Sequence, residues 1–396
     1  MKSQMKGARI LSGMRPTGAL HLGHWCGVLW NWQKLQADNE CFFFVADWHA
    51  LTTDYASPPD SSAAREMVLA WLSAGIDPGR AAIFAQSDVP AHAELYVLLA
   101  MICPLPWLMR LPTYKEQKEN LNRDLDTHGF LGYPLLQAAD ILAYRADAVP
   151  VGEDQLPHVE FAREIARRFN HLYGRSDDFL TKSDKALNLL DKQAREKLQK
   201  NARRYLRDGD DNAFRNAEEI INNADKDDRP ILKGLLFYGA EEILPAPQAA
   251  LTDAPKLPGT DGRKMSKSYG NAIALFDSPE DVGKKLARMQ TDPARKRRDD
   301  PGDPDKCPVA DLHNIFTAEK SRGDIFDNCR TAAIGCVECK RALADVINEK
   351  LAPVRDARKM HDKPGVVEEV LQAGAAKAKA EAELTLQQVR EAMKLR

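Results

Sequence analysis

The sequence has little of what marks secreted or membrane proteins. It contains only 7 cysteines in 396 residues, and no apolar run approaches the roughly 20 residues that a membrane-spanning helix needs. The first ten residues, MKSQMKGARI, hold no apolar stretch of the kind found in secretory signals. We therefore expect a cytoplasmic protein without a membrane anchor, in which reduced cysteines serve as core residues, metal ligands or catalysts rather than as disulfides.

The charge balance lacks a dominant sign as well. With 56 Lys and Arg against 58 Asp and Glu, the formal net charge is −2, so no global basic field attracts nucleic acid. Any contact with RNA must use local patches. A hydrophobic fraction of 44% and a charged fraction of 29% are typical of a globular protein, and the length is sufficient for two or three domains.

The first 170 residues alternate between strand and helix patterns. Short apolar runs predict buried strands at 8–14, 41–51, 81–87 and 146–154, and amphipathic stretches between them predict helices. This order predicts an α/β fold with a doubly wound parallel sheet, whose ligands bind at the carboxyl ends of the strands.

The pattern changes after residue 175. Residues 176–250 are highly charged and lack strand patterns, so we expect a helical insertion whose charged faces are mainly solvated. Helical patterns dominate again from about residue 280 to the end. We therefore expect the sheet domain to comprise residues 1–175 and 251–280, and a helical C-terminal domain to comprise residues 281–396.

The stretch RPTGALHLGHW (15–25) lies between the first expected strand and the first expected helix. Gly23 has no side chain, so a flat base could pack against the backbone there. A helix N-terminus favours phosphate, and the imidazoles of His21 and His24 could donate hydrogen bonds to phosphoryl oxygens. A turn with two surface histidines explains this stretch equally well when it is taken alone.

The stretch DGRKMSKSYGN (261–271) combines Lys264 and Lys267 with two serines and two glycines. This composition predicts a mobile basic loop that could close over a triphosphate and neutralise charge as it develops. An ordinary basic surface loop is the alternative.

The chain carries HLGH near its start and KMSKS late in the sequence, and its expected fold is doubly wound. This pair of motifs on such a fold resembles the signature of class I aminoacyl-tRNA synthetases. Residues 132–174, which include GEDQ and a histidine three residues on, look like the corresponding stretch of bacterial tryptophanyl-tRNA synthetases. The resemblance covers residues 8–174 and 252–396. It implies a Rossmann-like catalytic domain that uses ATP and Mg²⁺ to convert L-tryptophan to tryptophanyl-adenylate, transfer to tRNA(Trp), and a homodimer.

The resemblance also implies two sets of site residues. The ATP set is Arg15, Pro16, Thr17, His21, Gly23, His24, Gly152, Glu153, Asp154, Lys264, Met265, Ser266, Lys267 and Ser268. Within this set the expected catalytic residues, on the pyrophosphate side, are His21, His24, Lys264 and Lys267; many tryptophanyl enzymes have Thr and Asn at the two histidine positions. The tryptophan set is His49, Tyr133, Gln137, Asp140 and Gln155. In the family, the aspartate that matches Asp140 accepts a hydrogen bond from the indole N–H, which can only donate.

Two alternatives stay open. Gln137 and Asp140 also fit the Gln-x-x-Asp pattern of tyrosyl-tRNA synthetases, and most tryptophanyl enzymes carry methionine at the position of Gln137. The VGEDQ stretch and the wider similarity favour tryptophan. The second alternative is a synthetase-like regulator that binds tRNA or an amino acid without catalysis, and the intact HLGH and KMSKS motifs argue against it.

Four of the cysteines follow the spacing C-x21-C-x6-C-x2-C near the C-terminus. They are Cys307, Cys329, Cys336 and Cys339. No βαβ pattern surrounds them, which disfavours a redox pair, and the spacing alone leaves zinc, an iron–sulfur cluster and no metal open. A subset of bacterial tryptophanyl enzymes binds a [4Fe–4S] cluster through a pattern one residue longer in its first gap. The resemblance therefore implies a [4Fe–4S] cluster, with zinc as second choice.

The family resemblance makes the C-terminal segment a domain that binds the tRNA anticodon. The stretch KKLARMQTDPARKRRDD (284–300) would supply positive charge for RNA phosphates there. A solvated basic loop is the alternative.

Overall fold

The computed structural model of the chain describes residues 6–16, 18–58, 60–112, 127–174, 178–208, 210–236, 241–251 and 257–395. Across these ranges no helix is both long and apolar enough to cross a membrane. Five parallel strands form one sheet in the order β3-β2-β1-β4-β5. They are β1 (Arg9–Met14), β2 (Glu40–Val45), β3 (Ala81–Ala85), β4 (Ala148–Val151) and β5 (Gln248–Leu251). The parallel sheet confirms the predicted α/β fold class.

Two parts of the sheet differ from the predicted strands. The second apolar run stops being a strand at Val45, and α3 (Asp47–Asp54) begins two residues later. Asp47 stands in the first turn of α3, where a carboxylate is favoured by the helix dipole. The edge strand β5 is only partly buried, so it lacks the apolar run by which the other strands were predicted.

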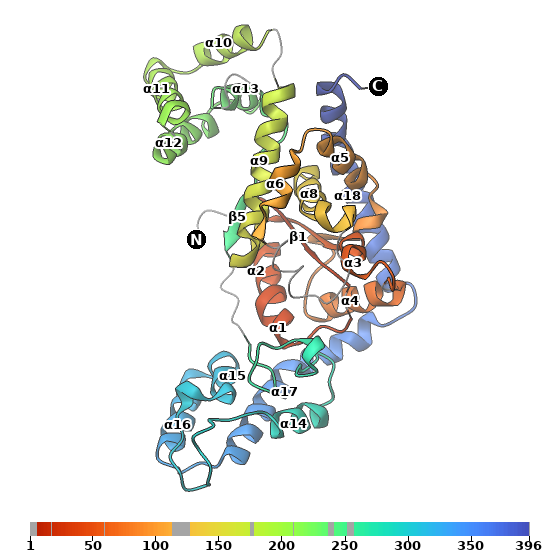
Figure 1. Ribbon diagram of the computed structural model, residues 1–396, viewed down its shortest axis with the longest axis vertical. Helices are drawn as coiled ribbons and strands as arrows, with labels where there is room; N and C mark the ends of the chain where they lie inside the picture. The colour runs from red at the N-terminus through yellow and green to blue at the C-terminus, as the bar shows by residue number, and fades with distance from the viewer. Residues whose placement is uncertain are drawn as a thin grey trace.

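Helices cover both faces of the sheet (Figure 1). They are α1 (Leu22–His24), the π-helical turn η1 (Trp25–Leu29), α2 (Trp30–Asp38), α4 (Ser61–Ser73), the 3-10 turn η2 (Gln86–Asp88), α5 (Ala91–Ala100), α6 (Leu105–Met109), α8 (His128–Ala143), the 3-10 turn η3 (Glu153–Gln155) and α9 (Leu156–Tyr173). Ile10 and Phe43 pack with α2 and α4 on one face, whereas Leu11 and Phe42 pack with α5, α8 and α9 on the other. Because neighbouring strand residues point to opposite faces, the two cores confirm the doubly wound arrangement.

Four helices between α9 and β5 form a core of their own. They are α10 (Phe179–Leu189), α11 (Lys192–Asp208), α12 (Asp211–Asn222) and α13 (Arg229–Gly234). Leu198, Ile221 and Leu232 are fully buried among them, in a cluster separate from the two sheet cores. Figure 1 shows these helices at one end of the molecule, beyond α9. Helices thus make up most of the expected insertion, whereas its last residues, 248–250, belong to strand β5 of the sheet.

The C-terminal helices lie at the opposite end of the molecule and then return to the sheet (Figure 1). They are α14 (Pro279–Ala287), the 3-10 turn η5 (Pro304–Lys306), α15 (Pro308–Phe316), α16 (Glu319–Arg330), α17 (Cys336–His361) and α18 (Val366–Ala392). Leu343, Ile347 and Leu351 of α17 join the same core as α2 and α4. On α18, a Cβ added at Gly374 would stand 1.9 Å from the Ile83 carbonyl oxygen of β3. Only glycine lets α18 approach the strand so closely.

Candidate active site

A cavity of about 300 Å³ opens at the carboxyl ends of β1 and β2. Its floor is formed by the end of β1, where a Cβ on Gly13 would stand 2.5 Å from the Phe44 ring. Its wall comes from α3, α8 and η3. A site at this edge is what a doubly wound parallel sheet predicts.

All five residues of the predicted tryptophan set line this cavity. They are His49 on α3, Tyr133, Gln137 and Asp140 on α8, and Gln155 on η3. The three α8 residues are spaced by four and three positions, so they project from one face of the helix. The structure thus gathers residues that lie more than 100 positions apart in the sequence.

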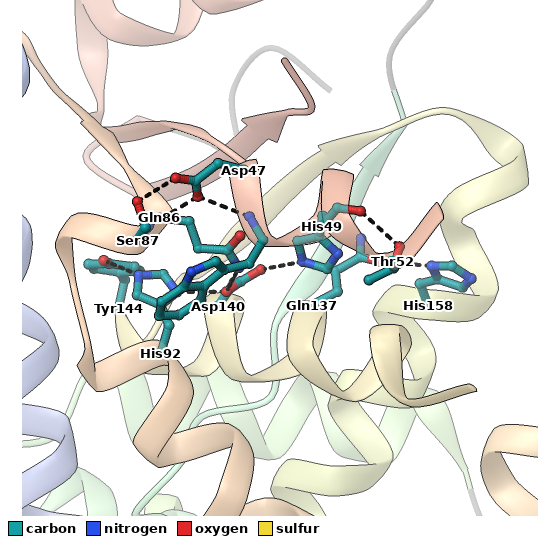
Figure 2. A network of polar contacts seen from close by, with 11 residues as sticks. Asp47, His49, Thr52, Gln86, Ser87, His92, Gln137, Asp140, Tyr144 and His158 are labelled. Atoms are coloured by element: carbon teal, nitrogen blue, oxygen red, sulfur yellow. Dashed lines mark hydrogen bonds and ion pairs between the residues drawn. The ribbon is translucent and has the colours of Figure 1, made fainter. Parts of the chain in front are cut away.

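Asp140 is the centre of a buried hydrogen-bond network (Figure 2). Its carboxylate is 1% exposed. Oδ2 accepts from His49 Nε2 at 2.8 Å, and Oδ1 accepts from Gln86 Nε2 at 2.8 Å and from His92 Nδ1 at 2.6 Å. Burial by itself would raise the pKa of Asp140, but the hydrogen bonds from His49 and His92 outweigh it and hold the pKa at about 2. The carboxylate is therefore ionised at neutral pH and acts only as an acceptor.

A second group of polar contacts lies beside the first. His158 is 1% exposed, and its Nδ1 lies 2.8 Å from Gln137 Oε1. Its Nε2 lies 3.3 Å from the Tyr133 hydroxyl. Burial lowers the pKa of His158 to about 4, so the ring is neutral at pH 7. Gln137 is thus held by a neutral histidine at the cavity wall (Figure 2).

The two signature stretches lie side by side although about 240 residues separate them in the sequence. Leu22 N–H donates to the Ile273 carbonyl at 3.0 Å, which joins the first motif to the segment that follows the lysine loop. The ammonium of Lys267 stands beside Gly18, with 3.4 Å between its Nζ and a Cβ built on that glycine. The pairing expected from the motifs alone is therefore present in the fold.

His21 and His24 each present one N–H. Gly23 N–H donates to His21 Nδ1 at 3.1 Å, and His21 N–H donates to His24 Nδ1 at 3.3 Å. Burial, reinforced by the Lys267 charge, lowers the pKa of His21 to about 4, and burial with the neighbouring His21 lowers the pKa of His24 to about 3. Both rings are neutral at pH 7, and because Nδ1 accepts in each, the proton sits on Nε2. Each Nε2–H can donate to an anion.

The lysine loop is held in shape by Asn271, which is 2% exposed. Its Oδ1 accepts from Ser266 N–H at 2.8 Å, and its Nδ2 donates to Asp261 Oδ1 at 2.6 Å and to the Lys264 carbonyl at 3.2 Å. A Cβ on Gly259 would stand 2.2 Å from Asn271 Nδ2. The amide therefore connects both arms of the loop, in a space that only glycine at 259 leaves open.

The other members of the predicted ATP set occupy different positions. Arg15 lines the cavity, Pro16 lines a smaller hollow beside it, and Thr17 lies outside the described residues. Gly152, Glu153 and Asp154 follow β4, with Glu153 and Asp154 exposed. Ser266 and Ser268 bond each other through their hydroxyls at 2.8 Å. Met265 is 4% exposed within a sheet core, so only its backbone is available to a ligand.

The four C-terminal cysteines gather where three elements meet. Cys307 precedes α15, Cys329 lies in the last turn of α16, and Cys336 and Cys339 lie in the first turn of α17. Burial, and then the charges of the Cys307, Cys329 and Cys336 thiols, raise the pKa of Cys339 to about 12. No group of three or more His, Cys, Asp or Glu side chains in the described ranges is arranged to hold a metal ion.

The basic stretch 284–300 is partly used inside the protein. Lys284 and Lys285 pair with the carboxylates of Glu280 and Asp277. Arg295 donates to the carbonyls of Arg298 and Ile334, and Arg298 donates to those of Ala332 and Ala333. Arg288, Lys296 and Arg297 are exposed. Fewer charges are thus available to RNA than the sequence suggests.

Several residues of the site were not found from the sequence. Gln86, His92 and Tyr144 belong to the Asp140 network but lie in apolar stretches without a motif. His158 follows GEDQ and could have been selected from that position. Asn271 directly ends the stretch DGRKMSKSYGN, and only its burial reveals its role in the loop.

The chain is similar to known proteins over nearly its whole length. Residues 3–245 and 212–352 match the family model of class I tRNA synthetases for tryptophan and tyrosine. The chain is 51% identical over 394 residues to the tryptophan–tRNA ligase of Ralstonia nicotianae, with 98% of each chain covered. It is 44% identical to that of Thermotoga maritima, covering 98% of this chain and 99% of the relative. A crystal structure of tryptophanyl-tRNA synthetase from Campylobacter jejuni, complexed with ADP and tryptophan, matches with a TM-score of 0.74 at 27% identity, covering 98% of this chain and 100% of that chain.

Proposed function

Because the chain belongs to the class I tRNA synthetases of tryptophan and tyrosine and is a tryptophan–tRNA ligase, we propose that the cavity beside α8 binds tryptophan through Asp140. The observation that carries this proposal is the buried, ionised carboxylate at the cavity wall. The indole nitrogen can only donate a hydrogen bond, and a carboxylate can only accept one. A substrate without a donor at this position would leave one acceptor position of the buried carboxylate unfilled, which is an effective penalty.

The amino-acid choice agrees with the sequence-based expectation. Relatives that are 51% and 44% identical over nearly their whole length are tryptophan–tRNA ligases, which confirms tryptophan over tyrosine as the substrate and an enzyme over a regulator. In our proposal Tyr133 and Gln155 contact the α-amino and carboxylate groups, since both line the same cavity. His49 then both lines the pocket and donates to Asp140.

We propose that ATP binds between the HLGH stretch and the lysine loop. The tryptophan carboxylate attacks the α-phosphorus, the bond to the bridging oxygen breaks, and pyrophosphate leaves. The Nε2–H groups of His21 and His24, with Lys264 and Lys267, stabilise the charge on the pyrophosphate side, which is positioning and electrostatic catalysis without a covalent enzyme intermediate. The adenylate then transfers its tryptophanyl group to the 3′-terminal ribose of tRNA(Trp). The complex of the Campylobacter jejuni enzyme with ADP and tryptophan supports the binding of both an adenine nucleotide and tryptophan.

Mg²⁺ enters this proposal through ATP. A magnesium ion keeps several waters and is held largely by substrate phosphates in nucleotide sites. The described residues contain no carboxylate or histidine cluster that could hold a metal ion, which suits an ion that arrives with the nucleotide. The protein would then bind the complex through the phosphate oxygens that Mg²⁺ leaves exposed.

The test of the pocket assignment is ATP–pyrophosphate exchange driven by tryptophan or by tyrosine. Asp140→Asn is expected to lower kcat/KM for tryptophan by about 10- to 100-fold, as the loss of a hydrogen bond to a charged group does, while KM for ATP changes little. Equal losses toward tryptophan and ATP would contradict the indole contact. Asp88→Asn, at an exposed position after β3, is the control.

We also propose that two copies of the chain associate through the α5–α6 surface. Val97, Met101, Leu105 and Met109 are between 49% and 72% exposed there, and exposed apolar residues that gather on one surface mark interaction sites. Met101→Glu should shift the chain from dimer to monomer in sedimentation equilibrium, whereas Val337→Glu, at an equally exposed residue on α17, should not. A wild-type monomer would refute the proposal.

We propose that the four C-terminal cysteines hold a [4Fe–4S] cluster. Cys307 precedes α15, Cys329 ends α16, and Cys336 and Cys339 begin α17, and four thiolates are the ligands of such a cluster. The spacing C-x21-C-x6-C-x2-C, one residue shorter in its first gap than the pattern of the cluster-binding tryptophanyl enzymes, favours the cluster over zinc. The cluster would supply a rigid link between α15, α16 and α17, outside the catalytic cavity.

Metal analysis distinguishes these possibilities. Anaerobically purified protein should contain iron and acid-labile sulfide in equal amounts, with a visible absorption band, and Cys336→Ser should lose both while adenylate formation persists. Cys103→Ser, which removes a cysteine near α6, should retain them. Stoichiometric zinc, or the absence of any metal, would refute the cluster.

We propose, finally, that the helical segment 281–396 engages tRNA(Trp) and that residues 1–175 with 251–280 form the catalytic domain, interrupted by the insertion 176–250. The exposed Lys296 and Arg297 support RNA contact on the C-terminal segment. Their joint replacement by alanine should raise KM for tRNA and leave pyrophosphate exchange unchanged. Unchanged KM for tRNA would remove this stretch from the interface.

A further inference from the structure

The wall behind Asp140 contains a second layer of polar residues. His92 on α5 is fully buried, with its Nδ1 2.6 Å from Asp140 Oδ1 and its Nε2 2.6 Å from the Tyr144 hydroxyl. The described residues that line the cavity include neither His92 nor Tyr144. Figure 2 shows both on the side of Asp140 opposite His49. They can therefore influence a bound amino acid only through Asp140.

The hydrogen bonds of this layer have a defined direction. A carboxylate only accepts, so His92 Nδ1 carries the proton that it donates to Asp140. Its Nε2 lies 2.6 Å from the Tyr144 hydroxyl, on the other side of the ring. Tyr144 thus holds the ring in the orientation that points Nδ1–H toward Asp140.

The acceptor capacity of Asp140 is almost fully used. A carboxylate oxygen has about two acceptor positions. Oδ1 receives two donors, from His92 and Gln86, whereas Oδ2 receives one, from His49. One acceptor position is left, on Oδ2, the oxygen that His49 approaches from the cavity wall.

We propose that His92, held by Tyr144, is a positioning residue that occupies Oδ1 and turns the Asp140 carboxylate so that the remaining acceptor position on Oδ2 meets the indole N–H. This inference rests on the proposed role of Asp140 in tryptophan binding. It adds His92 and Tyr144, which do not touch the substrate, to the residues that determine substrate specificity. Selectivity for a substrate with an N–H donor then depends on a series of hydrogen bonds that begins at the buried Tyr144 hydroxyl.

The test compares tryptophan with β-(3-benzothienyl)alanine, in which sulfur replaces the indole N–H. In ATP–pyrophosphate exchange, His92→Leu is expected to lower kcat/KM about 10- to 100-fold for tryptophan and at most about 3-fold for the analogue. His92→Asn places an amide nitrogen near the position of Nδ1 and should recover most of the loss. Tyr144→Phe should give a smaller loss that is again specific to tryptophan.

The controls separate positioning from support of the fold. Tyr173→Phe removes a hydroxyl from a tyrosine that packs on Phe169 in the same core cluster and should affect neither substrate. Equal losses for both substrates with His92→Leu and Tyr144→Phe would overturn the inference. Tyr144→Phe removes a single oxygen, so it decides the question even if His92→Leu does not fold.

Asp140→Asn in the same assay separates the inference from its premise. If this variant loses activity specifically toward tryptophan while His92→Leu and Tyr144→Phe do not, only the positioning role is overturned. If Asp140→Asn shows no tryptophan-specific loss, the indole contact is itself overturned.

Discussion

The amino-acid pocket and the lysine loop are built in opposite ways. In the pocket, one carboxylate receives donors from α3, η2 and α5, and the donors are themselves buried. In the loop, the functional lysines are exposed or half-buried, and one amide, that of Asn271, joins the two arms. The pocket is determined by side chains from several elements, whereas the loop is determined by Asn271 and by backbone hydrogen bonds within the loop itself.

This difference matches the tasks of the two regions. Recognition of an indole N–H needs an acceptor whose orientation is set before the substrate arrives, and a network in a medium of low dielectric constant provides it. Neutralising a triphosphate needs cations that can approach and withdraw as charge develops. We therefore expect changes in the loop to affect turnover and changes in the pocket to affect substrate choice.

The largest expected effect comes from the loop. Lys267→Ala should lower kcat by about 10²- to 10³-fold, the range found for the loss of one electrostatic stabiliser of a transition state, with little change in KM for tryptophan. Single-turnover adenylate formation measures the chemical step directly. Lys296→Ala, which removes an exposed lysine outside the loop, is the matched control. A rise in KM for tryptophan with unchanged kcat would contradict the division of tasks.

The histidines beside the loop should make stability depend on pH. Their folded-state pKa values, about 4 for His21 and about 3 for His24, lie below the usual histidine pKa of about 6.5, so the unfolded chain binds more protons between these limits. The free energy of unfolding should therefore fall as the pH drops from 6.5 toward 4, by roughly 2 kcal/mol for each histidine. Urea titrations at several pH values measure this slope. His24→Asn should flatten it, whereas His361→Asn, near the end of α17, should not.

A single substitution tests whether Asn271 holds the lysine loop in shape. Asn271→Ala removes three hydrogen bonds from a buried side chain and should cost about 1–3 kcal/mol in the free energy of unfolding. It should also lower kcat about 10-fold through misplacement of the lysines. Asn212→Ala, at an exposed position of the insertion, is the control. Normal turnover in Asn271→Ala would show that the loop is organised by other contacts.

The same contrast explains what the sequence predicts and what it does not. Apolar runs predicted four strands because these strands are buried. The edge strand β5 is partly exposed and was not predicted. The lysine loop and the HLGH stretch are continuous motifs, so their positions were predicted from local composition. The donors to Asp140 come from separate elements, and His92 reaches it only because α5 packs against α8. Such a network is defined by tertiary packing and leaves no local pattern.

The smallest expected effect concerns Gln137, at the edge of the pocket. Gln137→Met introduces the residue that most tryptophanyl enzymes carry there, and it removes the acceptor that His158 Nδ1 contacts at 2.8 Å. An unpaired buried N–H should lower the free energy of unfolding by about 1 kcal/mol, while the more apolar wall leaves kcat/KM for tryptophan within about 3-fold of wild type. Gln155→Met, at another residue that lines the cavity, should instead raise KM for tryptophan. If Gln137→Met impaired tryptophan use more than 10-fold, the Gln137–His158 pair would belong with Asp140 among the contacts that select the substrate.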